Sequence, residues 1–389
     1  MRASKPGNVV QKIQAGLVRK VLSKNKKTIP QTNIMKTTKS ILAAFGILVL
    51  VTPLASAQVA FDWATVADIN NTNDSTGYGA VSSIYNIATK EVNLFQYRAF
   101  LNAVAATDTY SLYNTSMGSN ANIAGITRSG SSGSYTYAVS GSGNRPVTYV
   151  SWFDAARFSN WVANGQPTGA QGNATTENGA YTLDGATNGV SFTKNGINPN
   201  TGATTTYWIP SENEWYKAAY YQPVGSGGPS DSYWLYPTGS DTIPNSSNGS
   251  TSDVNSGNFN RNVAPTDGVN DGYAVSGSTS FPTGNALTDG GAFTLADSYY
   301  GTFDQGGNVF EWNDAVISGS ARGLRGGSWD GGEDDLRASF RYFNFGVGPT
   351  FEGSNVGFRV GSVPEPSTAM LMMLGGAAYW LVRRRKATL

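Results

Sequence analysis

The chain has 389 residues, with 27 Lys and Arg, 26 Asp and Glu, and neither cysteine nor histidine. Disulfides, thiol nucleophiles, thiolate zinc sites and catalytic or metal-binding imidazoles are therefore excluded. Residues 58–362 alone carry 13 basic and 25 acidic side chains, so this part lacks the clustered Lys and Arg that nucleic-acid binding requires and would attract cations such as Ca²⁺.

The first segment in chain order has the pattern of an export signal. Met35-Lys36-Thr37-Thr38-Lys39 precedes the apolar run Ile41–Val51, and Ala55-Ser56-Ala57 follows it. A positive region, an apolar region and an A-x-A site in this order are typical of a secretory signal peptide. A short buried helix is the alternative. We therefore assign residues 1–57 to an N-terminal extension and signal peptide, with Met35 as the expected true start.

Residues 58–361 are expected to form one domain, because they contain no internal repeat of the kind that builds solenoids or propellers. Apolar spacing predicts amphipathic helices over Glu91–Ala105 and Asp154–Val162. A third helix is expected to begin at Ser211, because an acidic residue three positions later completes a capping box. The apolar run Pro146–Trp152 predicts a strand. Short elements between long Gly-rich loops favour an irregular α+β fold.

Six short motifs follow one another along this domain. They are Glu91-Val92-Asn93 with Phe100-Leu101, Arg145-Pro146-Val147 with Val150-Ser151-Trp152, Ile209–Trp215, Gly306–Trp312, Arg325–Trp329 and Gly357-Phe358-Arg359. Each motif is weak alone, but the six in this order are specific, and the domain resembles the formylglycine-generating enzyme (sulfatase-modifying factor) family. The resemblance implies a loop-rich α+β fold with C-type-lectin-like character.

The catalytic chemistry of that family does not carry over to this chain. Its active members oxidise a cysteine to formylglycine with O₂ and copper, and two cysteines that follow the Ser of the GGS motif hold the copper. Counted from Ser328, the matching positions are Gly331 and Leu336, and neither can bind Cu(I), which prefers sulfur ligands. We therefore expect no copper, and the sequence leans toward a protein without enzymatic activity.

The calcium ligands of the family have counterparts in this chain. The resemblance implies a first calcium site made by the side chains of Asp304 and Glu311 and the carbonyls of Gly307 and Val309. Hard oxygen donors on a Gly-containing turn suit Ca²⁺. The alternative is that Glu311 pairs with an arginine and Asp304 caps a turn.

A second calcium site is implied further upstream. Its donors would be the side chains of Asn258 and Asp271 and the carbonyls of Phe259 and Tyr273. The surrounding residues diverge from the family, and loops rich in Asn, Asp and Gly are also common turn formers. An ordinary turn is therefore the alternative here.

The residues around the lost copper position are candidates for a pocket, and we single out Ser328, Trp329, Asp330 and Glu333. They either support a purely structural GGS turn or form the floor of a binding site. Two functions follow from this choice. The first is a binding or structural module at the cell envelope or extracellular matrix. The second is an enzyme with altered, cysteine-independent chemistry, in which the carboxylates of this acidic loop act as acid and base.

The last residues of the sequence have the pattern of a second targeting signal. Val363-Pro364-Glu365-Pro366-Ser367 precedes the apolar stretch Thr368–Val382 and a basic end, Arg383-Arg384-Arg385-Lys386. This tail, residues 363–389, resembles the PEP-CTERM sorting signal of exported bacterial proteins; a plain tail anchor is the alternative. The resemblance implies an exosortase-type processing protease as partner, membrane contact only through the tail before processing, and a location at the envelope, outer surface or extracellular matrix. There, an exopolysaccharide or an envelope protein is the expected binding partner.

Overall fold

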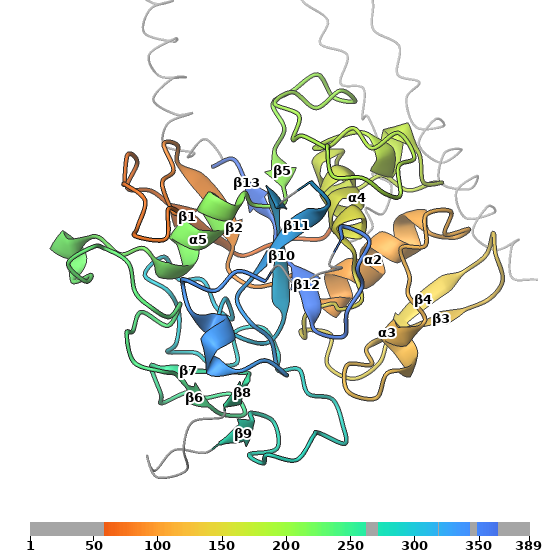
Figure 1. Ribbon diagram of the computed structural model, residues 1–389. Helices are drawn as coiled ribbons and strands as arrows, with labels where there is room; N and C mark the ends of the chain where they lie inside the picture. The colour runs from red at the N-terminus through yellow and green to blue at the C-terminus, as the bar shows by residue number, and fades with distance from the viewer. Residues whose placement is uncertain (1–57, 262–270, 318, 343–347, 365–389) are drawn as a thin grey trace, which may run out of the picture. The chain divides into compact units, whose positions relative to one another are not determined.

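The computed structural model describes residues 58–261, 271–317, 319–342 and 348–364 (Figure 1). The expected signal segment, 1–57, and the part of the sorting tail from residue 365 lie outside the described residues. The chain divides into the units Met1–Ala55 and Ser56–Leu389, and every described residue belongs to the second unit. Among the described residues, the structure contains no helix whose length and apolar character would let it cross a membrane.

The three longest helices of the described residues all begin with a capping box. They are α2 (Leu94–Val104), α4 (Trp152–Ala163) and α5 (Glu212–Tyr220). At α5 the Ser211 hydroxyl accepts the Glu214 backbone N–H, while the Glu214 carboxylate accepts the Ser211 N–H. These reciprocal bonds satisfy amide groups that a helix start leaves without partners. The start expected for the third helix is therefore confirmed.

Two expectations drawn from apolar spacing are corrected by the structure. Helix α2 begins after Asn93, whose side chain caps it, rather than at Glu91, and the ring of Phe95 in its first turn is 48 % exposed. The segment Pro146–Trp152 is not a strand, because Tyr149 has a positive φ of 55° and Ser151 caps α4, so that Trp152 is already helical. A short apolar run indicates that a segment is buried but not which secondary structure it forms, and here the buried segment is a turn that leads into a helix.

A four-stranded sheet closes the domain by joining its beginning to its end. Its strand order is β1 (Trp63–Val66), β2 (Tyr85–Ala88), β13 (Gly361–Ser362) and β5 (Tyr207–Trp208), and all neighbours are antiparallel. Gly361 lies opposite Ile87 on one side and Trp208 on the other. The last described strand therefore sits inside the sheet rather than at its edge.

A second sheet carries Glu311 on its central strand and ends one residue before Arg359. It has the order β11 (Ala321–Arg325), β10 (Phe310–Ile317) and β12 (Val356–Phe358), with β10 antiparallel to β11 and parallel to β12. Short pairs and single turns make up the remaining elements. These are α3 (Ser116–Ser119), β3 (Ile126–Ser129), β4 (Thr136–Val139), the π-helical turn Asn173–Glu177, the 3₁₀ turns Val224–Ser226 and Glu333–Leu336, β6 (Asn245–Ser246), β7 (Ser256–Gly257), β8 (Asn260–Arg261) and β9 (Gly272–Tyr273).

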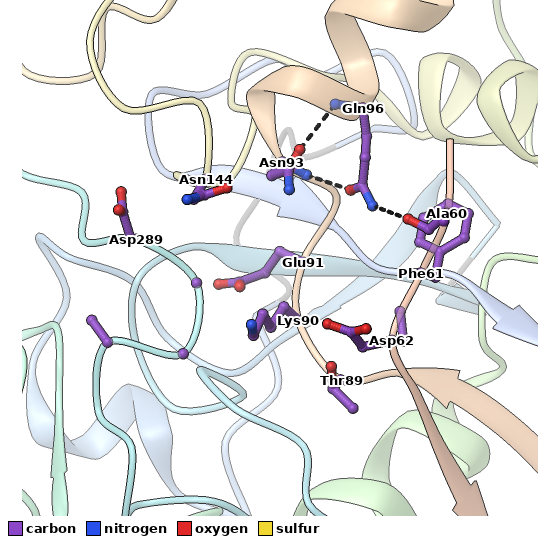
Figure 2. Close-up of a pocket in the computed structure, with 14 residues that line it drawn as sticks. Ala60, Phe61, Asp62, Thr89, Lys90, Glu91, Asn93, Gln96, Asn144 and Asp289 are labelled. Atoms are coloured by element: carbon purple, nitrogen blue, oxygen red, sulfur yellow. Dashed lines mark hydrogen bonds between the residues drawn. The ribbon is translucent and has the colours of Figure 1, made fainter. Parts of the chain in front are cut away.

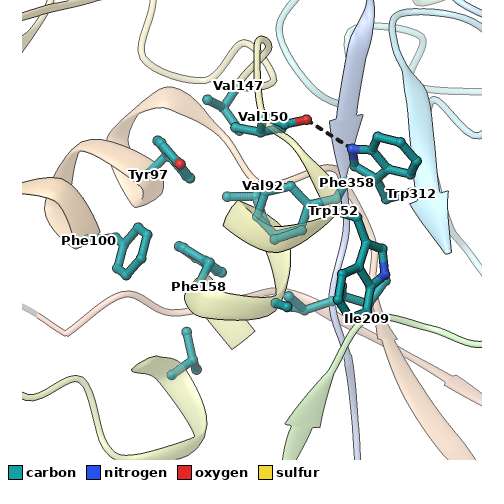
Figure 3. Close-up of a cluster of buried hydrophobic side chains, with 14 of the residues drawn as sticks. Val92, Tyr97, Phe100, Val147, Val150, Trp152, Phe158, Ile209, Trp312 and Phe358 are labelled. Carbon is teal, nitrogen blue, oxygen red and sulfur yellow. Dashed lines mark hydrogen bonds between the residues drawn. The ribbon is translucent and has the colours of Figure 1, made fainter. Parts of the chain in front are cut away.

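The main core lies between the helices α2 and α4 and the strand β12 (Figure 3). Phe158 of α4 packs edge-on against Phe358 of β12, with ring centroids 5.4 Å apart. Trp312 is fully buried, and its indole N–H donates to the Val150 carbonyl at 2.9 Å. Large aromatic rings contribute much of the buried area of such a core. Small helices, short strands and long loops together make the fold irregular α+β, as expected.

Candidate functional site

The centre of the candidate site is a fully buried ion pair between two motif residues. Glu311 lies on β10, and Arg359 directly follows β12, the parallel neighbour of β10. Arg359 Nε and Nη2 donate to the two Glu311 carboxylate oxygens, each at 2.6 Å. Trp215 Nε1 adds a third hydrogen bond to Glu311 at 2.8 Å. Both charges are removed from water, so they depend on each other.

Asp304 lies beside this pair in a strained turn. Its φ is 58°, in the left-handed region, and its Oδ2 accepts the backbone N–H of Gly291 at 2.5 Å. Burial raises the pKa of Asp304 to about 6, although the Gly291 hydrogen bond and the charge of Arg359 act to lower it. In the structure Glu311 pairs with an arginine and Asp304 accepts a backbone N–H of the loop 289–292, while calcium binding at these residues stays a prediction.

A third carboxylate, Glu91, was not singled out by the sequence. Its side chain is only 3 % exposed, and neither of its carboxylate oxygens has a hydrogen-bond partner. Burial raises the pKa of Glu91 well above its usual value, and the charges of Asp304 and Glu311 raise it further while that of Arg359 opposes them. The only sequence signal was its place in the first motif, because nothing in the spacing shows that a residue just before a helix is buried.

These contacts bear on the implied calcium site. The charge of Arg359 acts on Glu91, Asp304 and Glu311, and Lys90 adds a second positive charge near Asp304, so bound Ca²⁺ would reduce the negative charge that is left when the three carboxyls are ionised. An ion at Glu311, however, would have to share its oxygens with Arg359 and Trp215. Within the residues that the structure describes, no three acidic side chains converge as a metal cluster. The two carboxylates therefore fit calcium in charge, but both already accept hydrogen bonds from the protein.

The residues of the second implied calcium site lie near one another but are bound to other groups. Asp271 forms an ion pair with Arg261 at 3.0 Å, across the β8–β9 pair. The Phe259 carbonyl accepts the Ser246 hydroxyl at 2.8 Å. The side-chain amide of Asn258 donates to the Ala286 carbonyl, and the Tyr273 carbonyl accepts the Gly277 N–H. Each of these groups has a protein partner in the structure.

The GGS turn is tightly bonded within the domain. Ser328 is fully buried, and its hydroxyl donates to Asp330 at 2.8 Å. Asp330 also accepts the side-chain amide of Asn355 at 3.0 Å. The indole N–H of Trp329 donates to the Ser354 carbonyl at 3.2 Å. Three of the four pocket candidates thus belong to one network that ties the turn to the segment before β12.

The two positions that match the copper ligands of the family, Gly331 and Leu336, both pack tightly against neighbouring residues. Leu336 is fully buried and packs with Tyr236 and Phe259, so its side chain belongs to a hydrophobic cluster. At Gly331, an added Cβ would lie 2.5 Å from Oδ2 of Asp335. The pocket candidate Glu333 begins the 3₁₀ turn that ends at Leu336. Burial raises the pKa of Asp335 to about 6.

A cleft of about 480 Å³ lies elsewhere, on the side of Glu91 (Figure 2). Its walls come from the segment before β1, the link between β2 and α2, the residue Asn144, and the loop 289–292. Asp62, Lys90 and Asp289 line it together with Glu91. None of the four pocket candidates contributes to this cleft. No sequence pattern indicates this cleft, because its walls come from segments that are far apart in the chain.

Comparison with known families supports the resemblance. Residues 78–362 match the sulfatase-modifying factor enzyme 1-like domain, and the chain belongs to this family. Residues 362–386 match the PEP-CTERM protein-sorting motif. This motif marks an exported protein of the bacterial envelope and implies processing by an exosortase-type system. The predicted family and the predicted location are therefore both confirmed.

No curated protein matches the sequence. Among solved structures, the chain is similar to CarF, with 19 % identity, a TM-score of 0.40 and coverage of 79 % of this chain and 99 % of CarF. It is also similar to variable protein 1 of Treponema denticola, with 18 % identity, a TM-score of 0.41 and coverage of 79 % and 97 %. PvdO from Pseudomonas aeruginosa gives 15 % identity, a TM-score of 0.34 and coverage of 79 % and 92 %.

Proposed function

We propose that this exported chain is a binding module that lacks the oxidation chemistry of its family. The observation that carries the proposal is the burial of Leu336 among Tyr236 and Phe259. A thiolate at this position would have to reach a metal from inside an apolar cluster, whereas Leu336 fills that cluster with hydrocarbon. The absence of any cysteine agrees with this use of the position.

The test of the missing chemistry is direct. The full chain is incubated with a cysteine-containing peptide, Cu(I) and O₂, and aldehyde formation is measured by mass spectrometry. We expect no aldehyde, and any aldehyde above the rate without protein would overturn the proposal. A second assay tests the acidic loop that contains Glu333 and Asp335. Hydrolysis of a peptide or a glycan by the full chain that is lost in Asp335→Asn would favour the enzymatic alternative.

The binding partner that we propose is a polysaccharide of the envelope or matrix. Export by the PEP-CTERM route places the domain where such polymers occur. A polar cleft of about 480 Å³ has the size of a small-molecule or single-sugar site. Binding of the full chain to the exopolysaccharide of its own bacterium is measured with calcium and with EDTA. Binding supports the proposal; no binding in either condition would leave a protein partner to be tested.

We also propose that the folded domain binds calcium at Asp304 and the neighbouring carbonyls. The surplus of carboxylates over guanidinium around Glu311 supports this proposal. The ion would hold the turn between Asp304 and β10 in place, and we assign it no part in a reaction.

A further inference from the structure

Arg145 differs from the other arginines in the described part of the chain. Every other one except Arg98 forms an ion pair with a carboxylate. Arg145 has no such pair among the described residues, and its Nε is enclosed without a hydrogen-bond partner, whereas its two Nη groups stay accessible to solvent. An arginine keeps its positive charge at any ordinary pH, so this guanidinium offers donors that the described chain leaves unused.

Arg145 lines a cleft of about 300 Å³ that shares no lining residue with the larger cleft of Figure 2. Its other walls come from Asn248, from Val275 and Ser276, and from residues of the segment 282–287. No acidic side chain of the described residues lines it. In a domain with an excess of acids, this cleft is therefore a place where an anion meets a positive charge without nearby carboxylates on the wall.

One wall of this cleft is held in place by the protein itself. The side-chain amide of Asn122 donates to the Pro282 carbonyl at 2.6 Å, and the Asn122 carbonyl accepts the Ala286 N–H at 2.7 Å. The side-chain amide of Asn285 donates to the Ala124 carbonyl at 3.0 Å. A wall that is fixed before a ligand arrives reduces the entropy that binding has to overcome.

The lining limits what the ligand can be. One guanidinium matches one carboxylate, which it can bind through two parallel hydrogen bonds. The side chains of Asn248, Ser276 and Thr283 can exchange hydrogen bonds with hydroxyl groups. A polymer of phosphates would need clustered cations, and Arg145 is the single charged residue of the lining. The chemistry that fits is a neutral polyhydroxy body that carries one carboxylate.

The neighbouring larger cleft sorts such a ligand further. Asn144 lines the larger cleft and Arg145 the smaller one, so two consecutive residues border both. In the larger cleft Asp62 and Asp289 outnumber Lys90, which disfavours an anion there. A polymer that reaches both clefts would therefore place its acidic unit in the smaller one. We propose that the smaller cleft binds a uronic-acid residue of a polysaccharide, with the sugar carboxylate on Arg145.

This inference rests on the proposed polysaccharide binding and names its site and chemistry. The experiment is isothermal titration of the full chain with trigalacturonate at neutral pH. The matched ligand is the methyl ester of the same trisaccharide, which keeps the sugar and removes the charge. We expect the ester to bind at least tenfold more weakly. Equal affinities for the acid and the ester would overturn the proposal.

Variants then locate the site. Arg145→Gln removes the charge, and we expect it to weaken trigalacturonate binding at least tenfold. Asn248→Asp adds a negative charge to an exposed position of the same cleft, so it provides a second test if the first variant does not fold, and it should weaken binding in the same direction. The control is Arg98→Gln on α2, because Arg98 also lacks an ion pair but lies outside the cleft, and its affinity should be that of the parent. Unchanged affinity in folded Arg145→Gln would overturn the assignment.

The remaining outcomes separate this inference from its alternatives. A triglutamate peptide that binds as strongly as trigalacturonate would overturn the sugar. Trigalacturonate binding that requires calcium and is unchanged in Arg145→Gln would assign the carboxylate to a bound ion and overturn the site. Exopolysaccharide binding that is equal in the parent and in Arg145→Gln would overturn this inference alone. Binding of trigalacturonate but not of the exopolysaccharide would count against the proposed function and support the cleft.

Discussion

Arg359 and Glu311 hold each other through two hydrogen bonds of 2.6 Å, with no solvent exposure of either side chain. The pair joins β10 to the residue that follows its parallel neighbour β12, and Trp215, from a third motif, also donates to Glu311. Replacing Arg359 by Leu leaves the Glu311 carboxylate buried without its counter-charge. We expect a loss of about 3–5 kcal/mol in the free energy of unfolding, measured by urea denaturation.

A matched control for this variant exists on the surface. Arg337 pairs with Asp334 at 3.2 Å and donates to the Tyr236 hydroxyl, and the Arg337 and Asp334 side chains are 42 % and 77 % exposed. Arg337→Leu should change the free energy of unfolding by no more than about 1 kcal/mol. If the two arginine variants lose equal stability, a bound cation rather than Arg359 neutralises Glu311.

The next prediction concerns the leucine that occupies a copper-ligand position. Leu336→Ala removes three carbons from the cluster with Tyr236 and Phe259, and we expect it to cost about 2–5 kcal/mol of unfolding free energy. Leu235→Ala is the control, because Leu235 is 47 % exposed and its loss should cost less than about 0.5 kcal/mol. A stable Leu336→Ala protein would show that the position still borders a cavity, which would reopen the enzymatic alternative.

Calcium should stabilise the folded chain. A ligand that binds only the native state adds about 2.7 kcal/mol at a hundredfold excess over its Kd, so the Tm in saturating calcium should exceed the Tm in EDTA. Asp304→Asn should abolish most of this difference, whereas Asp297→Asn should retain it. Identical melting temperatures in calcium and EDTA would remove the calcium proposal at both implied sites.

Stability should rise as the pH falls from about 8 to about 5. Burial raises the pKa of Asp154 to about 7 and that of Asp314 to about 7, so each carboxyl holds its proton more tightly in the folded chain than in the unfolded one. Their stabilising contribution is fully present below the ordinary carboxyl pKa and is lost as the pH rises through about 7. We expect a gain of at least about 1 kcal/mol in unfolding free energy across this range.

The chain has no histidine, so the side chains that titrate in this window are buried carboxyls, and Asp304 and Asp335, whose pKa values burial raises to about 6, change the stability in the same direction. The pKa of Lys217 is lowered to about 8 by burial, so it titrates at the upper edge of the window and contributes little between about pH 5 and pH 7. Urea denaturation at several pH values measures the slope. Stability that is flat or falls toward pH 5 would contradict the raised carboxyl pKa values.

Sequence patterns predicted local features of this fold, such as helix starts, better than they predicted how each segment packs in the domain. Ser211 and the acid three residues later defined a helix start because both hydrogen bonds are local. The motif order predicted the family for a similar reason, since each motif is a short local segment of helix, strand or turn. The run Pro146–Trp152 misled, because apolar composition does not distinguish a strand from a buried turn before a helix.

The candidate site shows where such reasoning stops. Glu311 was singled out from its motif, but its partner Arg359 lies 48 residues away, and only the parallel pairing of β10 with β12 brings them together. Glu91 went unnoticed because its lack of hydrogen-bond partners is a property of the packed domain. The cleft depends on four separate segments, and no spacing rule connects them.

The position of β13 has a consequence for how the chain is made. This strand lies between β2 and β5, and the Pro-Glu-Pro of the sorting signal begins at Pro364, immediately after the strand and a single valine. The four-stranded sheet therefore lacks one of its inner strands until the residues directly before the sorting signal have been synthesised. A product truncated before Gly361 lacks both that strand and the sorting signal. Every polypeptide that carries the sorting signal therefore also contains all four strands of this sheet. Truncation before β13 consequently prevents sorting of an incomplete domain.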